Sequence, residues 1–442
     1  MKSVCLYFQV HQPFRHRRYR FFEIGADHYY YDDFSNEAVL DKMATKCYLP
    51  ANQLLLKLAK KLGNQLRVSF SFSGIVLDQL ELYAPEVIKS FQKLAKTGCV
   101  EFIAETYSHS LASLANPHVF KEQVIRNDEK ILALFGQKPR VFRNTEMIYS
   151  DQIGARVAEM GYEAILTEGA RQVLGWKSPG FLYVNMINPR LKVLMRNFKL
   201  SDDISFRFSN QNWPEYPLSA EKLISWIEQM PQQEEMVNLF MSYETFGERQ
   251  NKESGIFSFL ENLIENVTAH PDMKLATPSE IIAEIQPVSA VSVPSPVSWA
   301  DEERDLTAWQ GNEMQLEAFN KLYQLADSVK LCTDADALIL KDWNYLQSSD
   351  HFFYMSTKHA SDGEVHRHYN PFGSPYDAFI NYMNVLSDFS LRLNKQNDNQ
   401  LLNNKIMMLE TRLEEKDLKI RELEASILSF KQSLKQKRIP EF

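Results

Sequence analysis

The chain has 442 residues, of which 44% are hydrophobic and 12% aromatic, with only 18 prolines and 15 glycines. This length and composition exclude a disordered or fibrous protein and predict one large catalytic-size domain followed by smaller units. The net charge of −8 is spread over a mixed sequence without a basic stripe, which removes the electrostatic basis for nucleic-acid binding.

The N-terminal run MKSVCLYFQVHQP is short and lacks the cleavage site of a signal peptide. No stretch approaches the roughly 20 apolar residues that cross a bilayer, so no membrane partner is expected. Because the cysteines are widely spaced without a CxxC pair, buried free thiols are favoured over a metal site. The four are Cys5, Cys47, Cys99 and Cys332. These features predict a cytoplasmic protein.

As far as about residue 286, short β-branched or aromatic runs alternate with helical patterns, which predicts βα units around a parallel sheet. Helices are expected after Pro50, Pro85 and Asn116. Another begins at Thr277, where Glu280 completes a capping box. About seven strands with intervening helices imply a barrel. The strand candidates are Val4–Val10, Val68–Phe72, Val100–Ala104, Val141–Arg143, Ala164–Thr167, Lys192–Met195 and Val237–Ser242.

The segment QPVSAVSVPSPVSW, which ends at Trp299, has neither charge nor helical period and is typical of an ordered linker. The residues that follow show helical periodicity with little strand signal, including Met314–Ala326 and Ala378–Leu393. We therefore expect four parts: a barrel domain over 1–286, a linker over 287–299, a helical domain over 300–393 and a tail over 394–442.

The tail carries apolar residues at alternating spacings of four and three, a coiled-coil heptad pattern in which Lys416 fills one core position. A helix packed along its own globular body is the alternative, but charge-rich flanking positions favour a homo-oligomer. The number of chains and their direction, parallel or antiparallel, stay open. The apolar positions are Leu402, Ile406, Leu409, Leu413, Ile420, Leu423, Ile427, Phe430 and Leu434.

Reactive groups in parallel-sheet barrels lie at the carboxyl ends of strands, so polar residues directly after strand runs are the candidates. Glu146 lies just past a short strand, where donors such as Arg143 would hold a carboxylate ionised and suit it to act as a nucleophile. A lone glutamate in a loop is otherwise a solvated surface residue. Both interpretations of Glu146 stand at this point.

Two further candidates follow the strand that ends near residue 242. The two-residue period of a strand puts Ser242 and Glu244 on one face, so both side chains can point into one cleft. Alternatively, Glu244 bonds backbone groups at the barrel rim and Ser242 has no role. His11 and His109 with Glu105 also permit a metal site, but without an HExxH run or a close His pair, hydrogen bonding is favoured.

Four blocks of sequence resemble, in order, the motifs of glycoside hydrolase family 57: HQP at 11–13, GCVEFIAETYSHSLA at 98–112, VFRNTE at 141–146 and YETFGE at 243–248. Three later stretches are similar to its α-amylase-like branch: ADEERDL at 300–306, DHFFYMSTK at 350–358 and NPFGSPYDAFINYMNVL at 370–386. The resemblance implies an incomplete (β/α)7 barrel followed by a helical bundle. It also implies a cleft for α-1,4-linked glucans and a retaining mechanism without a metal or other cofactor.

By position, the resemblance makes Glu146 the nucleophile and places His11 near the bound sugar. The family's acid/base is an aspartate immediately before the Tyr-Glu-Thr run, and this chain has Ser242 there. A hydroxyl is far too weak an acid near neutral pH, and general acid–base catalysis contributes roughly 10²–10⁴ in rate. Activity is therefore expected to be low or absent unless Glu244 or Glu105 substitutes for the missing carboxyl group.

Seven residues are the expected sugar contacts, with Trp309 and Tyr354 first among the aromatic platforms, although most aromatics in a large domain pack the core. They are His11, Glu105, Tyr107, His109, Phe246, Trp309 and Tyr354. Three functions stay open: an impaired hydrolase or transferase acting on maltooligosaccharides, starch or glycogen, a non-catalytic glucan-binding or regulatory scaffold, and a purely structural assembly factor.

Overall fold

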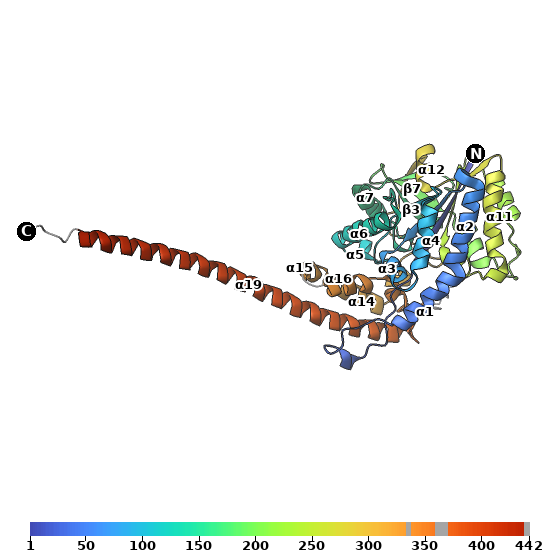
Figure 1. The fold of residues 1–442 in the computed structure, drawn as a ribbon. Coiled ribbons are helices and arrows are strands. Elements are labelled where there is room, and N and C mark those ends of the chain that lie inside the picture. Colours follow the sequence, from blue (N-terminus) through green and yellow to red (C-terminus); the bar gives the residue numbers. More distant parts are fainter. Residues whose placement is uncertain (333–336, 359–369, 437–442) are drawn as a thin grey trace, which may run out of the picture.

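A computed structural model of the protein describes residues 1–332, 337–358 and 370–436. They form an α/β body from which one long helix projects (Figure 1). The expected α/β fold with a parallel sheet and many helices is confirmed. Within the described residues, no helix has an apolar stretch long enough to span a bilayer.

Seven parallel strands carry the body, and each matches a predicted strand within one or two residues. They are β1 (Lys2–Val10), β2 (Val68–Phe72), β3 (Val100–Ile103), β4 (Val141–Arg143), β5 (Ala164–Glu168), β7 (Lys192–Arg196) and β8 (Met236–Ser242). Two runs are hydrogen-bonded in the orders β3-β2-β1-β8 and β7-β5-β4. A single parallel bridge, Ala104 to Phe142, joins β3 to β4. At the other junction, Asn238 Nδ2 donates to the Met195 carbonyl at 2.8 Å.

Three strands of three residues each were not predicted, because such short runs show no period and, unlike the equally short β4, they lie in no recognised motif block. They are β6 (Tyr183–Asn185), β9 (Met273–Leu275) and β10 (Ser289–Val291). β6 runs antiparallel to β7, and β9 runs parallel to β1. β10 lies in the segment expected to be a linker and pairs with β6.

The seven strands are buried on both faces, and their side chains alternate between two cores. On β1, Leu6 and Phe8 join the core under the outer helices, whereas Cys5 and Tyr7 join a smaller core on the inner face. Because side chains alternate along a strand, this series brings Gln9 to the inner face at the carboxyl end. By the same alternation, the last inward-facing residues of β2, β4 and β8 are Ser71, Arg143 and Ser242.

Helices cover the strands on the outside, and their starts follow the predicted signals. The Asn116 side chain caps α6 (Pro117–Phe135), and Thr277 and Glu280 form the predicted capping box of α12 (Pro278–Glu284). The remaining helices of the barrel region are α1 (Asp33–Met43), α2 (Leu49–Leu62), α3 (Gly74–Tyr83), α4 (Pro85–Ala95), α5 (Ala112–Ala115), α7 (Asp151–Glu159), α8 (Arg171–Leu174), α9 (Phe198–Asp202), α10 (Ala220–Glu228) and α11 (Ile256–Ala269).

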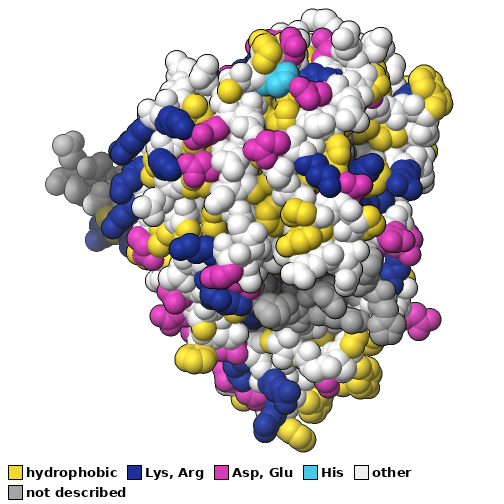
Figure 2. Space-filling view, turned by 90° about the vertical axis from the view of Figure 1, so that its right-hand side faces the viewer, with side chains coloured by type: hydrophobic (Ala, Val, Ile, Leu, Met, Phe, Trp, Pro, Cys, Tyr) yellow, Lys and Arg dark blue, Asp and Glu magenta, His cyan; other side chains and the backbone are white. Residues whose placement is uncertain are grey.

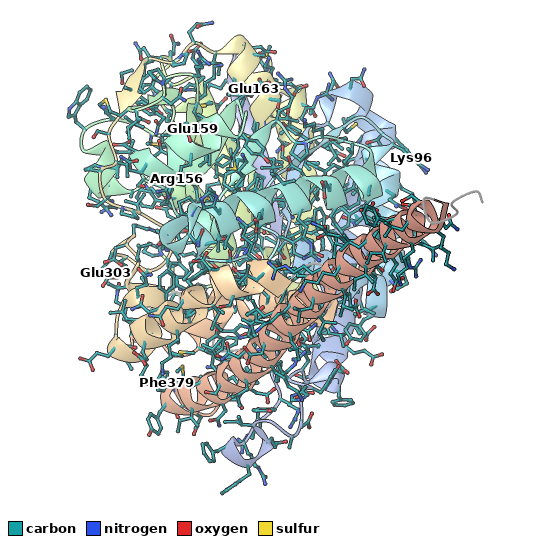
Figure 3. All side chains as sticks on the ribbon, turned by 90° about the vertical axis from the view of Figure 1, so that its left-hand side faces the viewer. Lys96, Arg156, Glu159, Glu163, Glu303 and Phe379 are labelled. Atoms are coloured by element: carbon teal, nitrogen blue, oxygen red, sulfur yellow. The ribbon has the colours of Figure 1, made fainter. Side chains whose placement is uncertain are left out.

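A group of helices follows the barrel region: α13 (Thr307–Gln310), α14 (Glu313–Gln324), α15 (Ala326–Cys332), α16 (Ala337–Leu346) and α17 (Ser349–Phe353). The first part of α19 (Pro375–Gln436) packs against them, with Phe379 near its start (Figure 3). Asn397 still contacts the body, because it accepts from Cys332 Sγ at 2.6 Å. Beyond Asn397, every side chain of α19 that the structure describes is exposed.

The surface of the body carries charges of both signs. Figure 2 shows one face, on which Lys and Arg side chains are interspersed with Asp and Glu. This agrees with the mixed charge pattern of the sequence.

Candidate active site

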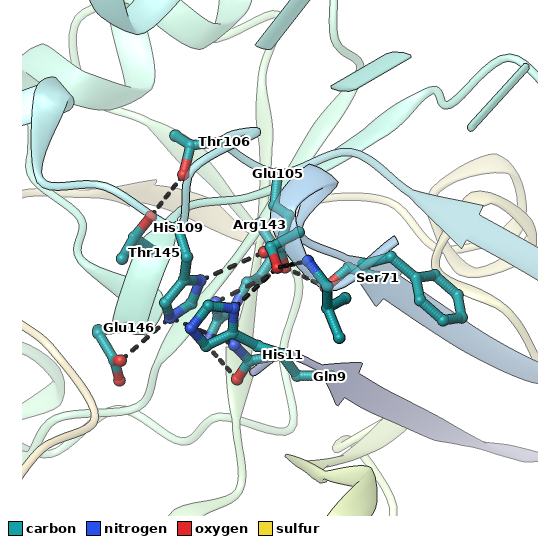
Figure 4. Close-up of polar contacts among 12 residues, drawn as sticks. Gln9, His11, Ser71, Glu105, Thr106, His109, Arg143, Thr145 and Glu146 are labelled. Atoms are coloured by element: carbon teal, nitrogen blue, oxygen red, sulfur yellow. Dashed lines mark hydrogen bonds and ion pairs between the residues drawn. The ribbon is translucent and has the colours of Figure 1, made fainter. Parts of the chain in front are cut away.

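Six buried polar side chains meet at the carboxyl ends of the strands (Figure 4). They come from β1, β2, β4 and the loops after β3 and β4: Gln9, Ser71, Glu105, His109, Arg143 and Glu146. The carboxyl ends of neighbouring parallel strands lie at the same edge of the sheet, which is why residues far apart in the sequence come together here.

Glu146, the predicted nucleophile, is held from two sides. Its Oε1 lies 3.1 Å from His109 Nε2, and its Oε2 accepts a hydrogen bond from Trp299 Nε1 at 2.5 Å. Its backbone has φ of 54°, in the left-handed region, and His109 has φ of 50°. Such conformations persist only where the surroundings hold them, and they concentrate at functional sites.

His109 lies between two carboxylates. Its Nδ1 donates to Glu105 Oε1 at 3.2 Å while its Nε2 donates to Glu146. Burial acts to lower the pKa of His109, but its hydrogen bonds to Glu105 and Glu146, together with the charges of these carboxylates, outweigh burial and raise the pKa to about 9. His109 is therefore a cation near neutral pH, and its charge lies directly against the Glu146 carboxyl group.

Glu105 completes a balanced set of buried charges. Ser71 Oγ donates to Glu105 Oε2 at 2.5 Å, and Arg143 Nη1 lies 3.8 Å from the same oxygen. Burial raises the pKa of Glu105, but His109 and Arg143 more than offset burial and lower it. With Glu146, the cluster holds two carboxylates and two cations, which limits the cost of burying them.

His11 connects the barrel to the later helices. Its Nε2 donates to Asp350 Oδ2 at 2.8 Å, its Nδ1 lies 2.7 Å from Ser73 Oγ, and its ring stacks on His109 with centroids 3.8 Å apart. Burial and the charge of His109 lower the pKa of His11, against the effect of Asp350. Because Asp350 lies in α17, both the barrel and the helical region build the site.

The protonation of His109 predicts a pH-dependent stability. A pKa raised from 6.5 to about 9 means that the folded state binds the proton more tightly, so the stabilisation is complete below pH 6.5 and is lost as pH rises through 9. The contribution is at most about 3 kcal/mol. Urea unfolding at pH 6 to 9.5 should show the native protein losing its advantage over the His109→Gln variant across this range. Parallel curves for the two proteins would contradict the assignment.

Ser242 and Glu146 border one cavity, together with Trp299 and Trp309. Ser242 is the last residue of β8, and its inward direction follows from the alternation along that strand. The predicted nucleophile and the serine at the acid/base position thus face the same space.

Glu244 is buried two residues beyond Ser242. It accepts hydrogen bonds from the hydroxyls of Ser242 and Tyr48. Burial raises the pKa of Glu244, against the effect of these two bonds and of Arg249. Glu244 is not among the described residues that line the cavity, whereas its hydrogen-bond donor Ser242 is.

Two other carboxylates border the cavity. Asp202 accepts hydrogen bonds from Arg196 at 2.5 Å and from Arg304 at 2.8 Å. Burial raises its pKa, but the two arginines outweigh burial and lower the pKa of Asp202, which makes it a poor proton donor. Asp301, with φ of 53°, lies 3.8 Å from Lys358 Nζ.

The expected sugar contacts divide into two groups. His11, Glu105 and His109 join the Glu146 network, and Trp309 lines the cavity. Of the seven, Trp309 alone is among the described residues that line the cavity, and the other three belong neither to the cavity lining nor to the Glu146 network. The Tyr107 hydroxyl donates to Asp78 at 2.8 Å, the Phe246 ring packs edge-on against Phe8, and the ring of Tyr354 lies near those of His351 and Phe372.

Several residues of the site were not predicted from the sequence. Trp299 ends the segment that the sequence predicts to be a linker. Asp350 lies in the motif block 350–358, but no spacing distinguishes it from its neighbours there. Arg196 directly follows a predicted strand, so the rule of polar residues at strand ends would have found it. Asp202 lies farther along the same connection.

Comparisons with known proteins give the family and the fold. Residues 5–294 match glycosyl hydrolase family 57. A Methanocaldococcus jannaschii protein named "Putative alpha-amylase" is 39% identical over 398 residues, which cover 86% of this chain and 83% of the relative.

Two solved structures share the fold. An α-amylase from Thermotoga maritima aligns over 91% of this chain and 96% of its own, with a TM-score of 0.60 and 14% identity. A branching enzyme from Thermococcus kodakaraensis, in complex with glucose and additives, aligns over 84% and 88%, with a TM-score of 0.62 and 13% identity. At these identities the similarity concerns the fold alone.

Proposed function

We propose that this chain, which belongs to glycosyl hydrolase family 57, is an α-amylase-like protein. It binds α-1,4-linked glucans and cleaves them slowly or not at all. The observation that carries this proposal is the cavity that Glu146 and Ser242 border together. A retaining hydrolase needs two carboxyl groups about 5 Å apart across the glycosidic bond. Here one side supplies a carboxylate and the other a hydroxyl.

The state of Glu146 supports glucan binding at an intact nucleophile site. The cation of His109 and the Trp299 donor hold this carboxyl group in position, as a nucleophile requires. The relative that is 39% identical supports the substrate class, because it is named "Putative alpha-amylase".

The proposal includes the architecture of the cleft. The seven parallel strands form an incomplete (β/α)7 barrel over residues 1–286, and the helical domain over 300–393 completes the cleft. The contact of His11 with Asp350 and the position of Trp309 support this arrangement. The segment 287–299 joins the two parts and brings Trp299 to Glu146.

Calorimetry and chain-length analysis with maltoheptaose test the proposal. We expect measurable binding by the native protein and hydrolysis little above that of a Glu146→Gln control. Absence of both binding heat and any shift in melting temperature would contradict glucan recognition. Rapid hydrolysis by the native protein would contradict the loss of the acid/base.

An intermediate outcome has a structural candidate. Slow turnover that Glu244→Gln removes would identify a relay, in which Glu244 passes a proton to the Ser242 hydroxyl and that hydroxyl to the leaving oxygen. The hydrogen bond between the two side chains and the raised pKa of Glu244 favour this route. Turnover unaffected by Glu244→Gln would direct attention to Asp301.

The tail of the chain self-associates, in this proposal, through a coiled coil over Leu402–Leu434. Combined with glucan binding, it would make the protein a multivalent scaffold, which is the alternative to slow catalysis as its biological role. The exposed apolar residues of α19 support it.

A further inference from the structure

The exposed part of α19 has an apolar stripe without a partner in the single chain. Its nine apolar heptad residues are between 45% and 67% exposed. By the rise of an α-helix, residues 397–436 extend about 60 Å beyond the last contact with the body (Figure 1). A helix this long and exposed is marginal alone, so packing of the stripe is what would stabilise it.

The spacing of the stripe assigns every residue a heptad position. Four of the five d positions are Leu402, Leu409, Leu423 and Phe430, and Lys416 occupies the fifth. The a positions are Ile406, Leu413, Ile420, Ile427 and Leu434. Isoleucine at a with leucine at d favours two strands over three or four.

The charges beside the stripe are sorted by sign. The g positions of three successive heptads are basic: Lys405, Arg412 and Lys419. The e positions of the same three heptads are acidic: Glu410, Asp417 and Glu424. All six side chains are exposed.

This sorting distinguishes the two directions of pairing. In a parallel, in-register pair, each g residue faces the e residue five positions later on the other helix. Lys405 then meets Glu410, and the same relation joins the other two basic residues to the other two acidic ones, so the two-fold axis gives six attractive pairs. In an antiparallel pair, g faces g and e faces e, which opposes like charges at every one of these positions.

We infer that α19 pairs with α19 of a second copy of this chain as a parallel, in-register, two-stranded coiled coil. Lys416 supports the register, because any shift by whole heptads would set its ammonium against an apolar core residue of the partner, whereas in register the two lysines meet each other and extend toward solvent. The inference rests on the self-association part of the proposed function and is independent of glucan binding.

Single-cysteine variants of the full chain test the direction. The four native cysteines are buried, so an introduced cysteine in the exposed tail supplies the reactive thiol. Under oxidised glutathione, Leu409→Cys should give a disulfide-linked dimer on a non-reducing gel. Glu415→Cys, at the outward c position, is the matched control and should stay largely unlinked.

The outcomes separate the possible failures. A chain that sediments as a monomer at micromolar concentration overturns self-association. A dimer in which Leu409→Cys does not cross-link, but a mixture of Leu402→Cys and Leu434→Cys does, overturns the parallel direction. A trimer overturns the two-stranded assignment.

Charge reversal tests the pairing itself. The triple variant Lys405→Glu, Arg412→Glu, Lys419→Glu makes both flanks acidic, and the Kd of the dimer should rise roughly 100-fold. Mixing it with the variant Glu410→Lys, Asp417→Lys, Glu424→Lys should restore tight association as a heterodimer. Equal affinity of the native and triple-variant homodimers would contradict the assigned pairs. Circular dichroism of each variant checks that the body stays folded.

Discussion

The Ser242→Asp variant is expected to hydrolyse maltooligosaccharides roughly 10²- to 10⁴-fold faster than the native protein, the range that a positioned general acid contributes. The substitution puts a carboxyl group at the end of β8, on the cavity that Glu146 also borders. Ser242 already contacts the buried carboxyl of Glu244. Two carboxyl groups in one buried site raise the pKa of one of them, which favours the protonated form that an acid catalyst needs.

Chain-length analysis of maltoheptaose digests measures this gain. Ser242→Asn is the matched control, because an amide has the shape of the aspartate side chain but is not an acid near neutral pH, so it should leave the rate at the native level. A Ser242→Asp variant that binds maltoheptaose but hydrolyses it no faster than Ser242→Asn would show that this position does not place an acid against the glycosidic oxygen.

In the Ser242→Asp background, Glu146→Gln is expected to abolish the gained activity, a loss of at least roughly 10²–10⁴. The amide keeps the shape of the side chain and can still bond Trp299, but it cannot attack the sugar to form the covalent intermediate of a retaining enzyme. Binding of maltoheptaose should change far less than turnover, since the lost interaction develops only in the transition state.

The comparison for this second variant is Glu248→Gln. Glu248 lies in the same motif block as Glu244, but its carboxylate pairs with Lys42 at 2.6 Å. Its replacement should leave the gained rate within a small factor. If both variants lowered turnover equally, the loss would reflect a general disturbance of the fold, and Glu146 would lose its assignment as the nucleophile.

The long strands and the helix starts could be predicted because their signals are local. The strict alternation of Val68–Phe72 and the caps at Asn116 and Thr277 are properties of neighbouring residues, and the structure has each of them. β6, β9 and β10 could not be found, since such short runs have no period, their pairing depends on distant strands, and, unlike β4, they lie in no recognised motif block. The single unbroken helix of α19 was expected in two parts, because its apolar pattern changes where it leaves the body.

The site could be predicted only in part, for a similar reason. Strand ends and motif blocks pointed to Glu146, His109 and Glu105, which the structure brings into contact. Trp299 contacts Glu146 across 153 positions of the chain, and Asp350 contacts His11 across 339 positions. No spacing of residues in a single sequence predicts contacts over such distances. The burial of single side chains could not be predicted either. Phe246 was an expected sugar contact, yet its ring lies in the core.

α19 contains no break between Pro375 and Gln436, so the residues that pack against α14, α15 and α16 and those that would pair with a second chain belong to one stiff rod. A dimer built on such a rod would hold its two clefts at a set separation and orientation, unlike bodies joined by a flexible tether that samples many distances. The avidity for a glucan polymer would then depend on how its branches are spaced. A kink introduced near Asn397 would weaken binding to a polymer while leaving the affinity for a short oligosaccharide unchanged.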